Sequence, residues 1–227
     1  MRVTVLTGAG ISAESGLATF RAADGLWENH RVEDVATPEA FERDPDLVHR
    51  FYNQRRARLA EVQPNPAHHA LADLARLHDL TLITQNVDNL HERGGSTDVI
   101  HMHGELTRAL CAACGHRWPA PLVMQPDDPC PACSAPATRP DIVWFGEMPY
   151  HMERIWQALE AADLFAAIGT SGNVYPAAGF AQHAARRGIP CVELNLAASA
   201  NARDFAERII GPASETVPDW VAGLGRR

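Results

Sequence analysis

The chain has 227 residues, of which 46% are hydrophobic and 21% are charged, so it can bury a sizeable core and is not a disordered tail. Its 20 basic and 28 acidic residues give a net charge of −8, which argues against a protein that mainly binds nucleic acid or an anionic membrane. No apolar stretch approaches the ~20 residues of a membrane span, and the N-terminus has no signal-peptide core, so we expect a soluble, cytoplasmic protein.

The hydrophobic pattern predicts an α/β protein with a parallel sheet. Residues 2–7 form a β-branched run that stops at a glycine turn, which is typical of a buried parallel strand leading into a helix. Further strands are predicted at residues 80–84, 99–102, 142–145, 164–168 and 191–194, and helices at about residues 46–62, 66–78, 150–162 and 176–188. Strands and helices that alternate in this way favour a parallel sheet covered by helices.

Two segments interrupt the alternation. Residues 28–65 are helical and charged, and residues 107–140 are rich in Cys and Pro with little periodicity. We expect both to be inserts that form a smaller second domain. Residues 1–27, 66–106 and 141–227 then make up the large domain.

A glycine turn follows the first predicted strand. Gly8, Gly10 and Ala13 fit the G-x-G-x-x-A pattern, in which the glycines allow a tight turn and a close approach of the backbone to a pyrophosphate. On pattern alone, a glycine turn without a ligand is an equally good interpretation. The acidic residue expected about 20 residues further on is missing, which argues against an ordinary hydride-transfer dehydrogenase.

Four cysteines have the spacing of a metal site. Cys111, Cys114, Cys130 and Cys133 form two C-x-x-C pairs with 15 residues between them. In a reducing compartment this spacing favours metal over disulfides, and two such pairs make a closed tetrahedral thiolate site. We therefore predict one structural zinc ion, with four unrelated thiols as the alternative. Cys191 lies in an apolar strand and is predicted to be a buried core thiol.

Polar residues follow four of the predicted strands. They lie at residues 85–88, 101–104 and 169–172 and at Asn195. Because α/β sheets bind ligands at the carboxyl ends of their strands, these residues are expected to form one site. Alternation places His101 and His103 on one face, where three roles are open: a second metal site, core histidines, or a general base facing a cofactor cleft.

Tyr52 and Arg55 lie three residues apart and project from the same face of a predicted helix. Arg55, Arg56 and Arg58 would by default form a solvated surface. The motif alone therefore assigns no function to this helix.

Six blocks of sequence occur in the order found in sirtuins, the NAD-dependent protein lysine deacylases. They are residues 8–16 with Phe20 and Arg21, residues 85–91, His103 with Gly104, the two C-x-x-C pairs, residues 143–147 and residues 169–171. The chain resembles this family over nearly its whole length. The resemblance implies a Rossmann-type NAD-binding large domain, and a small domain made of the helical insert and the zinc module. It also implies that an acylated lysine of a protein substrate binds between the domains.

The resemblance also implies a role for individual residues. The catalytic residues would be His103, Asn86 and Asp88, with His103, not His101, as the base that draws a proton through the ribose hydroxyls. A histidine with a pKa near 6.5 suits that role at neutral pH. The NAD-binding residues would be Gly8, Ala9, Gly10, Ser12, Ala13, Glu14, Phe20, Arg21, Trp27, Gln85, Asn86, Val87, Asp88, Gly169, Thr170, Ser171, Asn195, Leu196, Ala197 and Ala213. The substrate peptide would add a strand between two segments, contacting Val143, Phe145, Gly146, Glu147, Asn173 and Val174.

Tyr52 and Arg55 match the Tyr-x-x-Arg of the sirtuin branch that removes acidic acyl groups such as succinyl, malonyl and glutaryl. In that branch arginine binds the carboxylate and tyrosine adds a hydroxyl donor. Small residues at Ala22 and Ala23 would leave room for a longer acyl chain.

We therefore expect a deacylase that removes succinyl, malonyl and also acetyl groups from lysine and releases nicotinamide and O-acyl-ADP-ribose. A predominant deacetylase is the alternative within the family, and a noncatalytic NAD-sensing or zinc-ribbon interaction module is the alternative from another class. Neither a membrane nor a nucleic acid is expected as a partner.

Overall fold

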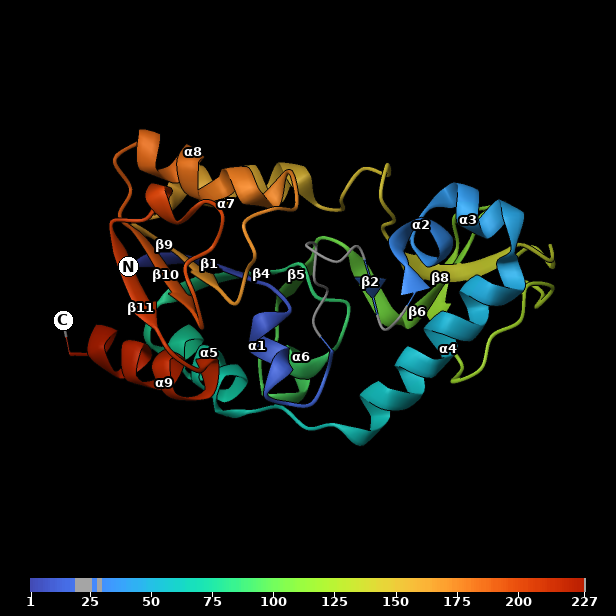
Figure 1. The fold of residues 1–227 in the computed structure, drawn as a ribbon, viewed down its shortest axis with the longest axis horizontal. Helices are drawn as coiled ribbons and strands as arrows, with labels where there is room; N and C mark the ends of the chain where they lie inside the picture. The colour runs from blue at the N-terminus through green and yellow to red at the C-terminus, as the bar shows by residue number, and fades with distance from the viewer. Residues whose placement is uncertain (19–25, 28–29, 227) are drawn as a thin grey trace.

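The computed structural model describes residues 1–18, 26–27 and 30–226, and its main element is a six-stranded parallel sheet (Figure 1). The strand order is β11-β10-β9-β1-β4-β5. In chain order the strands are β1 (Arg2–Thr7), β4 (Asp79–Thr84), β5 (Val99–His101), β9 (Leu164–Ile168), β10 (Cys191–Asn195) and β11 (Glu207–Ile210). The central strand β1 is buried from its second residue onward, as its β-branched run predicts.

Helices cover both faces of this sheet. α5 (Pro66–Leu77) and α9 (Ala213–Leu224) pack on one face, where Val3 and Val5 join a core with Leu71 and Val217. α7 (Met152–Ala161), η1 (Ala177–Gly179) and α8 (Phe180–Arg186) cover the other face, where Leu6 packs in a second core. Figure 1 shows these two layers above and below the sheet. The short helices α1 (Gly10–Ala13), α6 (Leu90–Arg93) and η2 (Ala202–Asp204) follow strands or connect them. We call this unit the large domain.

A second unit, the small domain, lies beyond the carboxyl edge of the large sheet (Figure 1). Its helices are α2 (Val32–Val35), α3 (Pro38–Arg43) and α4 (Pro45–Glu61). Its three-stranded antiparallel sheet has the order β7-β6-β8, with β6 (Gly104–Cys111), β7 (Arg117–Pro119) and β8 (Thr138–Ile142). The pair β2 (Leu26–Trp27) and β3 (His30–Arg31) precedes α2. A third core joins α2, α3 and α4 to β6 and β8.

The α/β fold with a smaller second domain is confirmed, but one predicted strand is wrong. The apolar run at residues 142–145 does not join the parallel sheet. The strand there is β8, which ends at Ile142 and pairs antiparallel with β6. Gly146 has a φ of +92°, and the Glu147 N–H donates to the Trp144 carbonyl, so the chain turns here instead of extending. Strands β6, β7 and β11 and helix α9 were not predicted.

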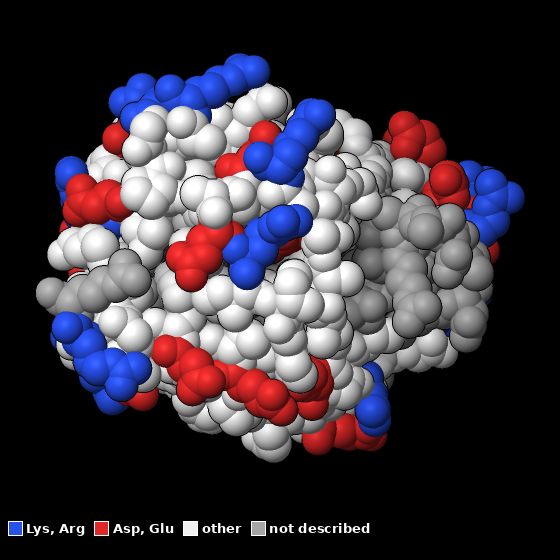
Figure 2. Space-filling model, turned by 60° about the vertical axis from the view of Figure 1, so that its left-hand side comes forward, with Lys and Arg blue, Asp and Glu red and all other residues white. Residues whose placement is uncertain are grey.

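β6 and β8 each cross a predicted domain boundary, near residues 106 and 141. The division of the chain at those points stays a prediction. Among the described residues, none of the helices combines the length and the apolar character needed to cross a bilayer. On the face seen in Figure 2, arginines and acidic residues are interspersed, so the described part of that face carries no continuous basic surface.

Candidate active site

A cleft of about 640 Å³ lies between the carboxyl edge of the large sheet and the small domain. It collects residues from the loops after β1, β4, β9 and β10, from α4 and from the segment after β8. Fourteen of the residues predicted to bind NAD line it: Gly8, Ala9, Gly10, Ser12, Gln85, Asn86, Val87, Asp88, Gly169, Thr170, Ser171, Asn195, Leu196 and Ala197. The base and the predicted substrate residues line it too: His103, Tyr52, Arg55, Val143, Phe145, Gly146, Glu147, Asn173 and Val174.

Three predicted NAD-binding residues lie outside the lining of this cleft. Ala13 ends α1, and Ala213 begins α9 and packs in the large-domain core. Glu14 accepts hydrogen bonds from the Ser214 amide at 2.9 Å and the Ser214 hydroxyl at 2.7 Å. A carboxylate at that end of α9 stabilises the helix. NAD binding by these three residues stays a prediction.

Five further residues cannot be placed in the same way. Phe20, Arg21, Ala22 and Ala23 lie outside the described residues. Trp27 is described only through its backbone, which pairs with His30. Their predicted roles remain predictions.

Sequence reasoning missed several residues that line the cleft. They are Leu17, Ala18, Ala36, Ile142, Trp144, Pro149, Tyr175, Ala198, Ser199 and Ala200. Ala198, Ser199 and Ala200 continue the loop that begins at Asn195, so the strand-end argument could have included them. Trp144 stands inside a motif that was identified only for its backbone.

Two glycine turns form the floor of the cleft by direct contact. The Gly8 amide donates to the Ile168 carbonyl and the Gly10 amide to the Gly169 carbonyl, both at 2.9 Å. A Cβ atom on Gly10 would lie 2.6 Å from the Gly169 Cα, and Gly169 itself has a φ of +63°. Glycine is therefore required on both sides of this contact, which leaves backbone rather than side chains exposed to a ligand such as a pyrophosphate.

Asn86 and Asp88 are held by the turn that follows β1. The Asn86 amide nitrogen donates to the Gly8 carbonyl at 3.1 Å and to the Ser12 hydroxyl at 3.2 Å. The Ser12 hydroxyl in turn donates to the Asp88 carboxylate at 3.0 Å. Burial raises the pKa of Asp88, and the hydrogen bonds from the Leu90 amide and Ser12 partly offset that rise. Two loops from neighbouring strands are thus locked together at the cleft.

His103 has one ring nitrogen fixed and the other left for chemistry. Its Nδ1 lies 3.1 Å from the Gln85 carbonyl, which can only accept, so Nδ1 carries the hydrogen and Nε2 is the basic atom. Burial lowers the pKa of His103, and the bond to Gln85 only partly offsets this. An imidazole that is neutral at physiological pH and lines a cleft can act as a general base.

His101 is a paired core residue. It is 7% exposed, lies outside the lining of the cleft, and has Nε2 2.7 Å from a Glu92 carboxylate oxygen. Burial lowers its pKa, but the hydrogen bond and charge of Glu92 outweigh burial and raise it overall. Within the described part of the chain, the cysteine group is the one cluster of three or more candidate metal ligands, so a second metal site at His101 and His103 is wrong for that part.

Tyr52 and Arg55 of α4 form the wall of the cleft on the small domain. Tyr52 is fully buried and Arg55 is 9% exposed. Neighbouring Arg56 is also buried, and its Nε donates to the Leu122 carbonyl at 3.2 Å. The solvated surface expected by default is therefore wrong for Arg55 and Arg56, whereas Arg58 is exposed and paired with Glu61.

The segment predicted to pair with a substrate strand already uses part of its backbone. The Val143 amide donates to the His103 carbonyl at 2.9 Å, and the Phe145 amide donates to the Ala36 carbonyl at 3.0 Å. The Glu147 carboxylate forms an ion pair with Arg139 at 2.8 Å. An added peptide strand would have to use the other backbone groups of the segment, so strand addition stays a prediction.

The four cysteines converge as a zinc site requires. All four Sγ atoms lie within 4.8 Å of one another, with Cys111 and Cys133 3.7 Å apart and Cys114 and Cys130 3.8 Å apart. Four sulfurs at zinc-ligand distance in a tetrahedron would be about 3.8 Å apart. The donor set and its spacing therefore fit one closed, structural Zn²⁺ ion. Cys191 is buried in the core, as predicted.

The model of the Sir2 family matches residues 8–176. This chain belongs to the Sir2 family. The NAD-dependent protein deacylase of Escherichia coli strain K12 is 59% identical over 228 residues, which cover 98% of this chain and 82% of that protein. The NAD-dependent protein deacylase of Bdellovibrio bacteriovorus is 55% identical, covering 96% of this chain and 94% of its own length.

Solved Sir2 structures have the same fold. A Sir2 homologue in complex with NAD has a TM-score of 0.90 at 39% identity, covering 99% of this chain and 89% of its own. A Sir2 complex with a p53 peptide and NAD⁺ has a TM-score of 0.83 at 27% identity, covering 99% and 94%. The resemblance that six sequence blocks predicted is therefore confirmed. The Sir2 family alone does not decide which acyl group is removed.

We expect this Sir2 protein to contain about one equivalent of zinc, lost when Cys114 is replaced by alanine. Because the site would tie the end of β6 to the segment that precedes β8, strong chelation should lower the melting temperature before it affects chemistry in the cleft. Metal analysis and thermal unfolding measure this, with Cys191→Ala as the matched control that keeps its zinc. A zinc-free preparation with undiminished stability would contradict the assignment.

Proposed function

We propose that this Sir2 protein is an NAD-dependent protein-lysine deacylase that removes succinyl, malonyl and also acetyl groups. One observation carries the proposal: a histidine held in one tautomer by Gln85 shares a cleft with Asn86 and Asp88 on one wall and with Tyr52 and Arg55 on the other. A noncatalytic NAD sensor or zinc-ribbon module would not need an imidazole arranged as a base.

The part of the cleft expected to bind NAD is lined by backbone groups and short polar side chains. Gly8, Gly10 and Gly169 present main-chain groups, and Asn195 donates to the Thr170 carbonyl at 2.7 Å, which fixes the loop at the next strand end. When bound, NAD would supply the ADP-ribose that accepts the acyl group and the nicotinamide that leaves.

The side chains at this end of the cleft would have two roles, binding of the nicotinamide ribose and proton transfer. Asn86 and Asp88, locked by Ser12, would hold the carboxamide and the adjacent ribose. Nε2 of His103 would take the proton that a ribose hydroxyl gives up. The imidazole stays oriented because Nδ1 remains bonded to the Gln85 carbonyl. Burial of these groups limits the access of water, which strengthens their electrostatic interactions.

The acyl specificity rests on the α4 wall. Arg55 is a largely buried cation at the cleft, and a guanidinium binds a carboxylate through two parallel hydrogen bonds. Tyr52, one turn earlier, can add a hydroxyl donor. An acyl group that ends in a carboxylate would meet both, whereas the methyl of an acetyl group offers them no acceptor. The exclusion of nucleic acids as partners and the cytoplasmic location stay predictions from composition.

Replacing His103 by alanine should lower deacylation at least ~100-fold, the usual scale for loss of a general base. His101→Ala is the matched control two residues away and should cost much less, because His101 pairs with Glu92 outside the cleft lining. Steady-state rates on one acyl-lysine peptide measure both. Equal losses, or turnover retained in His103→Ala, would refute the assignment.

The pH profile separates the same two histidines. A general base works unprotonated, so kcat/KM falls as the pH drops through its pKa. Burial lowers the pKa of His103, so the midpoint of the acid limb should lie below the ordinary histidine value of about 6.5. The pKa of His101 is raised, so a limb controlled by His101 would have its midpoint above that value. Measured kcat/KM between pH 5 and 9 decides between them.

Arg55→Met should cut desuccinylation about 10- to 100-fold, mainly through a higher KM, because a charge-assisted pair worth about 1.5–3 kcal/mol is lost. Deacetylation should stay level or improve. Tyr52→Phe should act in the same direction more mildly. Arg58→Met, on the same helix but exposed, is the control and should leave the succinyl-to-acetyl ratio unchanged. A parallel fall in both activities of Arg55→Met would mean that Arg55 supports the fold.

A further inference from the structure

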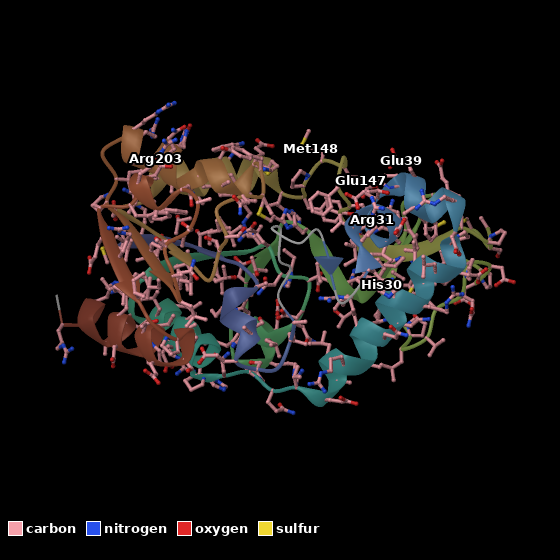
Figure 3. All side chains as sticks on the ribbon, in the orientation of Figure 1. His30, Arg31, Glu39, Glu147, Met148 and Arg203 are labelled. Carbon is pink, nitrogen blue, oxygen red and sulfur yellow. The ribbon has the colours of Figure 1, made fainter. Side chains whose placement is uncertain are left out.

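Trp144 is the buried centre of the segment that follows β8. It is 2% exposed and lines the cleft between Val143 and Phe145. The bond from the Phe145 amide to the Ala36 carbonyl keeps this segment beside the end of α2. Figure 3 labels Glu147 and Met148 at its far end. The predicted role of the segment concerned its backbone, which leaves the indole of Trp144 unexplained.

The indole is held from several sides. The Arg139 guanidinium carbon lies 3.5 Å from the centroid of the Trp144 ring, and the Phe41 ring lies 5.2 Å away. Arg139 is fixed in turn by Glu147, whose carboxylate also accepts a 2.8 Å hydrogen bond from the Trp144 amide. A side chain held in this way presents its ring N–H in one direction.

The ring N–H of Trp144 points toward the hydroxyl of Tyr52. Trp144 Nε1 lies 3.0 Å from the Tyr52 oxygen, in a buried hydrogen bond between the segment after β8 and α4. An indole N–H can only donate, so the Tyr52 oxygen must be the acceptor. The phenol proton must therefore point away from the indole, so the hydroxyl acts as a donor on its other side. A donated hydrogen bond at the oxygen also strengthens the hydroxyl as a donor, because hydrogen bonds in a chain polarise one another.

The protonation state of Tyr52 suits this arrangement. Burial raises the pKa of Tyr52 well above its ordinary value, and the bond from Trp144 and the charge of Arg55 offset only part of that rise. The hydroxyl therefore keeps its proton at physiological pH. A carboxylate accepts hydrogen bonds and cannot donate them, so it is the natural partner of a hydroxyl prepared as a donor.

We propose that Trp144 is a specificity-determining positioning residue, whose indole N–H sets the Tyr52 hydroxyl as a donor for acyl groups that end in a carboxylate. This inference rests on the acidic-acyl activity proposed above. If it holds, the selectivity for acidic acyl groups depends on Trp144, although Trp144 itself needs no contact with the acyl group.

The test is Trp144→Phe, which removes the N–H and keeps an aromatic ring beneath Arg139. The expected result is a loss of about 3- to 10-fold in kcat/KM on a succinyl peptide, through KM, and a far smaller change on the matched acetyl peptide. Site-specific incorporation of 3-benzothienylalanine at position 144 replaces N–H by sulfur with little change of shape, and should give the same shift if Trp144→Phe folds poorly. Trp156→Phe, on the large domain outside the cleft lining, is the control.

A double-mutant cycle with Tyr52→Phe distinguishes positioning of the Tyr52 hydroxyl from a purely structural role of Trp144. Without the phenol oxygen the indole has lost this acceptor, so Trp144→Phe should cost no further selectivity in the Tyr52→Phe background. Additive losses would overturn the inference, as would a parallel fall in both activities. If Arg55→Met is selective and Trp144→Phe is not, only the inference fails. If Arg55→Met is also unselective, the proposed acidic-acyl activity fails with it.

Discussion

The contact between the glycine turns after β1 and β9 is the constraint on which the site depends. The amides of Gly8 and Gly10 donate to the last residue of β9 and to Gly169 just after it, and neither a Gly10 nor a Gly169 side chain would fit at that distance. With the turns this close, the Gly8 carbonyl lies where Asn86 can donate to it. The position of Asn86 then fixes Ser12 and, through Ser12, Asp88. A backbone contact thus organises the polar groups of one wall.

The opposite wall follows a different principle, the burial of polar groups that have defined partners. α4 carries Tyr52 and Arg55 into the cleft and uses the buried Arg56 to bind the zinc-module loop near Leu122. Taking the Arg55 guanidinium out of water costs free energy, and the carboxylate of a bound acyl group would offset part of that cost. The same helix therefore connects the zinc module to the residues proposed to read the acyl group.

Local signals explain what the sequence predicted well. Cys111, Cys114, Cys130 and Cys133 could be assigned because ligand spacing is a local property that survives any arrangement of the rest. The long helix α4 was predicted within one residue at each end because its period is regular, and Asp44 caps its first turn. The polar residues at strand ends converged because parallel strands share a carboxyl edge.

Long-range contacts explain which features could not be predicted from the sequence. An apolar run at residues 142–145 reads equally well as a strand of either sheet, and only the pairing of β8 with β6 decides. Glu14 contacts Ser214, 200 residues away in sequence, and Trp144 contacts Tyr52 across 92 residues. No local pattern signals such partners. Helix α9 was missed because Pro218 interrupts its helical pattern.

We expect one cleft to transfer an acidic acyl group from lysine to NAD-derived ADP-ribose. The most direct measurement mixes equal amounts of acetyl-, succinyl- and malonyl-lysine peptides of one sequence with the zinc-loaded protein and NAD, and follows all products by mass spectrometry. We predict nicotinamide and unmodified peptide in equal amounts, with succinyl- or malonyl-ADP-ribose forming faster than acetyl-ADP-ribose. Peptide deacylation without nicotinamide release, or acetyl-ADP-ribose as the dominant product, would contradict it.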